Sequence, residues 1–434
     1  MKLGGRLSAA TLVLEDVMAR HQPVKIAARD WGKRARYAGS KDRAWVSGLV
    51  LDALRRRNSL AWSMGGDDAR GLIFAAARFA WGLDLRQLEQ ACYEDHGPTP
   101  LTEQERQGLL LAPDPAAPAH VQGDFPEWLT PHMQRAFGER AVIEGQAMAV
   151  RAPVDLRVNT LKSDPERAAK ALVSAKAQPS PLLRNAFHIP AADPSQREAS
   201  LEAIPAYSRG WVEVQDAGSQ IAAAAANVCA GEQVLDYCAG GGGKTLALAA
   251  AMGGKGQVFA YDIDGRRLSA LIPRLKRSGA HNVQLCHPAE ERVLAPLEGQ
   301  MDCVFIDAPC SGTGTWRRRP DTKWRLTERS LAKRQAEQAE ILTAAARYVK
   351  PGGRMVYATC SFLVEEDEDQ VAAFLSSAPE FRAESAGDAA AASRLLTLEG
   401  EALVKANEGP RGGVRLTPHR AGTDGFFFAV LRRA

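Results

Sequence analysis

The chain has 434 residues, of which 45% are hydrophobic and 24% charged, with a formal net charge of +4. This composition excludes a fibrous repeat and wholesale disorder, and no apolar run approaches the ~20 residues that cross a bilayer. The length exceeds what one core usually supports, so we expect two or three domains. The start lacks a secretory segment and the seven cysteines form no Cys-x-x-Cys pair. We therefore expect a cytoplasmic monomer with no membrane contact, disulfide or metal.

Residues 1–115 show helical spacing of apolar side chains, as in Leu7, Leu14 and Val17, and no strand-like alternation. They predict an all-helical domain that ends in a proline-rich linker at about 112–122. Basic residues concentrate in it at Lys25, Arg29, Lys33, Arg34, Arg36, Lys41 and Arg43. This stretch is either an RNA-binding arm or an ordinary solvated helix face.

Residues 125–211 mix short helical stretches with strand-like runs such as 154–161. They predict a small α+β module. From Val212 onward strands and helices alternate, which predicts an α/β domain at 212–434 with a doubly wound, mainly parallel sheet. We expect its strands at 233–238, 257–262, 282–286, 302–307 and 354–359, with 425–431 completing the sheet edge. Residues 383–410 suggest no chemistry.

A glycine run follows the first of these strands and precedes an Ala/Leu-rich helix. It consists of Cys238, Ala239, Gly240, Gly241, Gly242, Gly243 and Lys244. Glycines let a ligand touch the backbone, and a helix start offers free amides to an anion. Asp262 ends the next strand, where a carboxylate can hold both hydroxyls of a ribose. We interpret the pair as a nucleotide site, the alternative being a structural turn. Lys244 either serves this site or faces water.

Two cysteines follow later strands in turn-like contexts, Cys310 within 307–314 and Cys360 within 359–361. Ligand clefts form at such strand ends. Cys92, Cys229 and Cys303 are expected to be buried small hydrophobes. Carbon 5 of cytosine becomes nucleophilic only after a group such as a thiolate adds to carbon 6. A neighbouring acid such as Asp307 can support the ring as charge develops at nitrogen 3.

A second basic stretch lies just after Cys310. It contains Trp316, Arg317, Arg318, Arg319, Lys323, Trp324 and Arg325. Cations that neutralise phosphates, interleaved with indoles that stack on bases, are typical of single-stranded RNA recognition. We therefore predict RNA contact here, the alternative again being a solvated face.

Together these segments resemble the RsmB/Sun-type RNA (cytosine-5) methyltransferases over most of the chain. The resemblance lies in 215–220, in the glycine loop, in Asp-Ala-Pro-Cys-Ser at 307–311, in Thr-Cys-Ser at 359–361, in the basic stretch and in the last strand. Residues 157–162 resemble the start of the family's small RNA-binding module. The helical start is similar to the NusB-like RNA-binding domain of the ribosomal RNA branch.

The resemblance implies a Rossmann-like domain that binds S-adenosyl-L-methionine through residues 238–244, Asp262, Glu290 and Asp307. It implies Cys360 as nucleophile, Cys310 as an aid to product release, and Asp307 and Lys244 at the reacting base. The chain departs from the family at Gly240-Gly241, where Ala-Pro is usual, and at Glu290, where Gly-Asp is common.

The implied function is methylation of cytosine carbon 5 in a single-stranded element of ribosomal RNA, of the small subunit in particular. Methylation of tRNA is the nearest alternative. A non-catalytic RNA-binding assembly factor that keeps the fold is the alternative from another class.

Overall fold

The computed structural model describes residues 1–111, 114–191, 204–290 and 292–434. They form two compact units. The helical unit contains Met1–Arg151 together with Thr315–Leu326, and the catalytic-fold unit contains the described remainder.

The helical unit is built on long amphipathic helices whose apolar faces meet. Leu7 and Leu14 of α1 and Leu49 of α3 are all fully buried in one core. Side-chain caps start several of the helices, as where Thr102 and Glu105 form a reciprocal capping box. The helices are α1 Leu3–Arg20, α2 Val24–Arg34, α3 Ser40–Arg55, α4 Arg57–Met64, α5 Ala69–Ala75, α6 Leu85–Cys92, α7 Glu103–Leu110, α8 Ala119–Gln122, α9 Thr130–Phe137 and α10 Ala141–Met148.

The helical unit extends beyond the linker that the sequence predicts. Helices α8 to α10 belong to the same compact unit, although the expected helical domain ends at 115 and the α+β module starts at 125. Asn58 of α4 donates to the carbonyls of His120 and Phe125, and the Ser59 amide donates to Asp124. These bonds tie the chain after the proline-rich stretch to the helices before it. Residues 112 and 113 of that stretch lie outside the described residues.

The basic stretch 316–325 also packs into the helical unit, around α17 (Pro320–Lys323). Lys323 is 1% exposed, and its Nζ donates to the Arg55 carbonyl at 2.9 Å and to the Asp124 carbonyl. The Trp324 Nε1 donates to the Leu54 carbonyl at 2.6 Å. Trp316 is 1% exposed. The prediction that this stretch stacks on RNA is therefore wrong for Trp316 and Lys323, because a buried indole and a buried ammonium cannot reach a base or a phosphate.

The α+β module of the catalytic-fold unit is an antiparallel sheet in the order β2-β3-β1-β4, with helices α11 (Pro165–Leu172) and α12 (Pro205–Ser208). Its strands are β1 Val154–Val158, β2 Gln178–Pro179, β3 Ala186–Ile189 and β4 Val212–Val214. Strand β4 pairs with β1, so 212–214 complete this sheet. The structure thus differs from the predicted boundary between 211 and 212, because a three-residue strand needs the partner that only the tertiary fold supplies.

The main sheet has the order β10-β12-β9-β8-β5-β6-β7, with β11 paired to β12. Strands β5 to β9 are parallel to one another, and β10, β11 and β12 join antiparallel. The strands are β5 Gln233–Asp236, β6 Gln257–Tyr261, β7 Val283–Cys286, β8 Met301–Asp307, β9 Val349–Thr359, β10 Phe381–Glu384, β11 Val414–Leu416 and β12 Phe426–Arg433. This confirms the predicted Rossmann-like sheet. The last strand, however, lies between β9 and β10 rather than at the edge.

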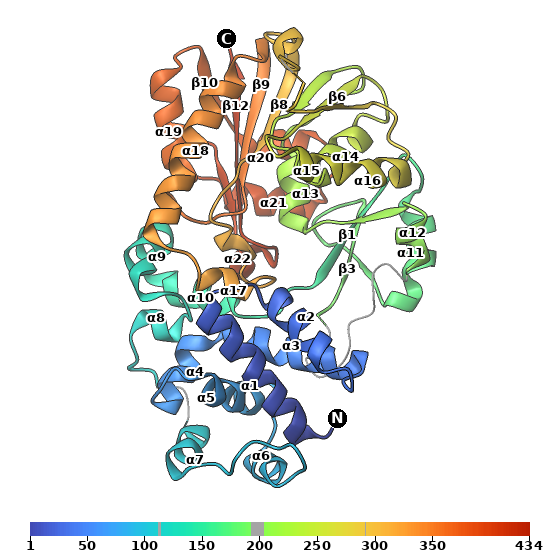
Figure 1. Cartoon of the computed structure of the whole chain (residues 1–434). Helices are drawn as coiled ribbons and strands as arrows, with labels where there is room; N and C mark the ends of the chain where they lie inside the picture. Colours follow the sequence, from blue (N-terminus) through green and yellow to red (C-terminus); the bar gives the residue numbers. More distant parts are fainter. Residues whose placement is uncertain (112–113, 192–203, 291) are drawn as a thin grey trace. The chain divides into compact units, whose positions relative to one another are not determined.

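Helices cover both faces of this sheet (Figure 1). Val234 packs in one core with residues of α13 and α14, whereas its neighbour Leu235 packs in another core with residues of α18 and α19. Such alternation follows from the two-residue period of a strand. The helices are α13 Ala217–Ala224, α14 Gly243–Ala251, α15 Gly265–Ser269, α16 Leu271–Ser278, α18 Glu328–Ala346, α19 Glu368–Ser377, α20 Ala386–Ala392, α21 Leu398–Ala406 and α22 Pro418–Ala421. Across the described ranges, every helix is too short or too polar to span a bilayer.

Candidate functional site

The predicted site residues lie at the carboxyl ends of four neighbouring parallel strands. The glycine loop follows β5, Asp262 follows β6, Asp307 ends β8 and Cys360 follows β9. Because these strands run in the same direction, their carboxyl ends meet at one edge of the sheet, where open α/β folds bind ligands.

The glycine loop wraps around the Asp262 carboxylate. The Gly240 amide donates to Asp262 Oδ2 at 2.8 Å, and the Asp264 amide donates to Oδ1 at 2.9 Å. Gly240 and Gly242 adopt φ of +52° and +80°, a region that favours glycine. A Cβ on Gly242 would stand 2.1 Å from Leu271. The loop therefore needs glycine at both positions and brings backbone amides to the carboxylate.

Lys244 and Asp307 form an ion pair, with Nζ 2.6 Å from Oδ2. The lysine side chain is 7% exposed and lies 5.0 Å from the centre of the Phe426 ring, whereas the Asp307 side chain is 34% exposed. The interpretation of Lys244 as a residue facing water is thus wrong. The pair presents one accessible carboxylate, held by a buried cation, at the strand ends.

A second carboxyl group, that of Asp236, lies at the end of β5, just before the glycine loop. Asp236 is fully buried and accepts from the Thr245 hydroxyl at 2.6 Å, while its Oδ1 has no partner among the described residues. Burial raises the pKa of Asp236 to about 7. A group whose pKa is near neutrality beside a ligand loop is characteristic of functional sites.

The two cysteines singled out in the sequence are adjacent in space. Cys310 Sγ lies 3.4 Å from Cys360 Sγ, and both side chains are partly accessible. The hydrogen bond with the Cys360 sulfur, followed by burial, raises the pKa of Cys310 well above its usual value. Cys310 therefore keeps its proton. Cys238 also has a strongly raised pKa because of burial, so it contributes backbone to the loop rather than a reactive thiol.

Two carboxylates that the sequence analysis missed accept hydrogen bonds from residues next to the two cysteines. Glu366 is fully buried and accepts from the Ser311 amide at 2.7 Å and from the Ser311 hydroxyl. The adjacent Asp367, also fully buried, accepts from the Thr359 hydroxyl at 2.6 Å. Each carboxylate thus holds the neighbour of one cysteine. Their sequence context, an acidic run at 365–369, suggests solvent exposure and gives no sign of this role.

The start of the last strand contacts the Cys310 loop through the backbone. The Gly425 amide donates to the Gly314 carbonyl at 2.8 Å, and the Gly314 amide donates to the Cys360 carbonyl at 3.0 Å. A Cβ on Gly314 would stand 2.1 Å from the Gly425 carbonyl oxygen. The backbone contact between the Cys310 loop and the start of β12 therefore requires glycine at Gly314.

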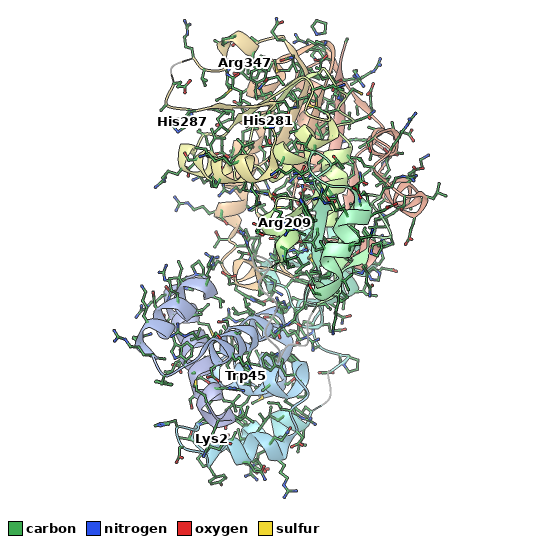
Figure 2. The ribbon with its side chains drawn as sticks, turned by 90° about the vertical axis from the view of Figure 1, so that its right-hand side faces the viewer. Lys2, Trp45, Arg209, His281, His287 and Arg347 are labelled. Carbon is green, nitrogen blue, oxygen red and sulfur yellow. The ribbon has the colours of Figure 1, made fainter. Side chains whose placement is uncertain are left out.

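Glu290 follows β7, and its side chain is exposed to solvent. A hollow beside Asp262 is lined instead by Ile263, Asp264, Gly265, Arg266, Ser269 and His287. Ile263 is 86% exposed although it is apolar. In the sequence the only signal is an apolar residue directly after a strand-end carboxylate; the structure adds that this side chain is exposed and can offer a face to an aromatic base. Figure 2 shows His287 at the molecular surface.

The arrangement fits S-adenosylmethionine. Asp262 can accept from ribose hydroxyls, the Ile263 side chain can cover an aromatic base, and the accessible Asp307 carboxylate can receive an amino group. Gly243 has open space where a Cβ would stand. The fold and the site thus define the class of S-adenosylmethionine-dependent methyltransferases.

The comparisons with known proteins agree. Residues 223–432 match the family described as 16S rRNA methyltransferase RsmB/F, and residues 125–194 match the RsmF/B-like ferredoxin-like domain. The chain is 37% identical over 308 residues to the ribosomal RNA small subunit methyltransferase B of Salmonella typhi, covering 70% of this chain but 66% of that relative. The chain belongs to the RsmB/F methyltransferase family.

Solved structures show the same fold. The protein PH0851 has a TM-score of 0.74 at 23% identity, with 98% of this chain and 99% of that chain covered. NSun6 from Pyrococcus horikoshii, solved with the S-adenosylmethionine analogue SFG, has a TM-score of 0.60 at 20% identity, covering 71% of this chain and 98% of that chain. The likeness to PH0851 extends over almost the whole chain, the helical region included.

Proposed function

We propose that this protein methylates carbon 5 of a cytosine in small-subunit ribosomal RNA. The observation that carries the proposal is the thiol pair at the ends of β8 and β9, with the sulfur atoms of Cys310 and Cys360 3.4 Å apart. A pair of thiols beside a nucleotide-type loop suits addition to and elimination from a pyrimidine ring. The name of the Salmonella relative supports the RNA class.

In the proposed mechanism, Cys360 adds as thiolate to carbon 6 of the cytosine, and the Cys310 thiol stabilises that thiolate beforehand by donating a hydrogen bond. The Lys244–Asp307 pair is assigned to the ring, with the Lys244 ammonium donating a hydrogen bond as negative charge develops at nitrogen 3 and Asp307 holding that ammonium in place. S-adenosylmethionine, when bound at the glycine loop and Asp262, supplies an electrophilic methyl group. A water molecule then takes the proton from carbon 5, the electron pair of that C–H bond restores the ring double bond, and Cys360 leaves as thiolate. Cys310 assists this release by donating a hydrogen bond to the departing sulfur.

The RNA contacts of this function are assigned to exposed basic side chains. In the α+β module, Arg167 and Arg209 lie over the Trp211 ring at 4.0 and 5.0 Å, and Arg209 lies at the surface (Figure 2). Helices α2 and α3 carry the basic stretch 25–43, which we propose to be an RNA arm of a NusB-like helical domain. Cations beside indole rings suit a single-stranded backbone and its bases.

The test is transfer of labelled methyl groups to protein-free small-subunit RNA, with denaturing gels that reveal covalent protein–RNA adducts. Cys360→Ala should abolish transfer and adduct while S-adenosylmethionine binding, measured by calorimetry, stays intact. Cys310→Ala should accumulate adduct. Cys229, which the sequence predicted to be buried, is exposed, and Cys229→Ala should behave as wild type. An adduct trapped in Cys360→Ala but not in Cys310→Ala would reverse the two roles. Faster transfer to tRNA would change the proposed substrate.

A further inference from the structure

The glycine loop is held by a hydrogen bond from a side chain outside the loop. Residues 240 to 243 are four consecutive glycines, and glycine maximises the entropy that a loop loses on ordering. In the structure the Gly241 carbonyl accepts from Arg274 Nη1 at 2.5 Å. Arg274 belongs to α16, more than thirty residues further along the chain.

Arg274 is itself held by a buried carboxylate. Its Nη2 donates to Glu213 Oε2 at 2.9 Å, and the Glu213 side chain is 2% exposed. Arg277, one turn further along α16, donates to both oxygens of the same carboxylate at 2.7 and 2.8 Å. Charge-assisted bonds of this kind are short and strong, and a guanidinium keeps its charge throughout the physiological pH range. The direction of the Arg274 side chain is therefore fixed.

Helix α16 is in turn fixed to the α+β module. Asn159, which is 2% exposed, donates from Nδ2 to the carbonyls of Gly210 and Ser278, both at 2.8 Å. The Lys162 ammonium donates to the Arg277 carbonyl at 2.7 Å. Glu213 lies on β4 of that same module. An unbroken set of hydrogen bonds thus runs from the module, through α16, to the glycine loop.

We propose that Arg274 is a positioning residue that sets the cofactor loop and ties it to the α+β module through Glu213. The bond to the Gly241 carbonyl does for this loop what a proline ring does covalently, because each removes loop conformations that cannot bind the ligand. This proposal rests on the proposed function, since it assigns the loop to S-adenosylmethionine. Through the same hydrogen bonds, the α+β module that carries Trp211 is linked to the cofactor loop.

The geometry at residue 241 permits a test in which a proline ring replaces the Arg274 hydrogen bond. Gly241, unlike Gly240 and Gly242, is not among the residues with positive φ. Within the part of the chain that the structure describes, its amide donates no hydrogen bond. A Cβ on Gly241 would meet Arg274 Nη1 at 3.7 Å, an ordinary contact. A side chain at 241 therefore meets no clash at its Cβ, and the proline variant loses no hydrogen bond of the 241 amide.

The experiment compares Arg274→Ala, Gly241→Pro, the double variant and the matched control Lys276→Ala, an exposed position on the same helix. Calorimetry measures S-adenosylmethionine binding, and hydrogen exchange measures protection of the loop amides at 238–243. Arg274→Ala should weaken binding by about three- to tenfold, the range of one net hydrogen bond, and speed loop exchange. The double variant should recover both properties, and Lys276→Ala should match wild type.

Two results would overturn the proposal. One is an Arg274→Ala protein with wild-type affinity and wild-type loop exchange. The other is a loss that Gly241→Pro fails to restore and that comes with a lower unfolding temperature, which would make Arg274 a general structural residue. A wild-type protein that binds no S-adenosylmethionine would refute the proposed function instead, and faster loop exchange in Arg274→Ala would still support the tether.

Discussion

The two basic stretches of this chain look alike in sequence, but only the second contains buried cations. All seven basic side chains of the stretch 25–43 are exposed. In the stretch 316–325, Trp316, Arg317 and Lys323 are at most 5% exposed. These side chains pack inside the helical unit and stabilise it. Charge density therefore does not reveal a binding surface by itself. The stretches differ in their surroundings. Neighbouring helices offer carbonyl groups and aromatic rings to the second stretch, and these contacts offset the desolvation free energy of a buried cation.

The largest effect that this comparison predicts is on stability. Lys323→Met should lower the free energy of unfolding by about 3 kcal/mol, because it leaves the buried Arg55 and Asp124 carbonyls without a donor and Asp124 without its nearby cation. The matched change Lys33→Met, at a side chain that is 70% exposed, should leave stability unchanged. Urea unfolding of both variants checks this. Equal effects would mean that the two stretches are energetically equivalent.

The second prediction concerns pH. Burial lowers the pKa of Lys323 from 10.5 to about 8. Between these values the folded protein has lost the proton while the unfolded chain still binds it, so stability should rise with pH. Relative to Lys323→Met, the wild type should gain about 2 kcal/mol in unfolding free energy from pH 8 to pH 10. Denaturant titrations at both pH values measure the gain, and a constant difference would mean that Lys323 stays charged.

The smallest expected effect is on RNA affinity. Reversing Lys33, Arg34 and Arg36 to Glu should weaken RNA binding and reduce the slope of log affinity against log salt by about two, because each lost contact with single-stranded phosphate removes about 0.7. Filter binding over a salt series measures the slope. A control triple, Arg347, Arg382 and Lys405 to Glu, changes the same charge at exposed sites of the other unit.

An equal loss in both triples would show a nonspecific charge effect and would reject the RNA arm. Point variants are preferable to removal of residues 1–112. That deletion would also take away Leu54 and Arg55, which hold the segment following the Cys310 loop, so it would change more than RNA contact.

The sequence determined the order of the main elements and the positions of the reactive groups. Strand periodicity located β5 to β9, and a glycine run or a cysteine directly after a strand can only lie at that strand's carboxyl end. Because parallel strands end on one edge, Asp262, Asp307, Cys310 and Cys360 had to come close together. These are local patterns, and local patterns can be read without the fold.

Tertiary structure alone decided which polar groups are buried. The acidic run at 365–369 and the basic stretch at 316–325 both suggest exposed side chains, the latter for RNA contact, yet Glu366 and Lys323 are buried. Their burial depends on partners more than 50 residues away in sequence, such as Ser311 for Glu366 and Asp124 for Lys323. Buried Glu213 likewise pairs with Arg274, 61 residues further along the chain. A buried charge persists only where distant backbone groups replace the water it loses, and no pattern of neighbouring residues encodes that replacement.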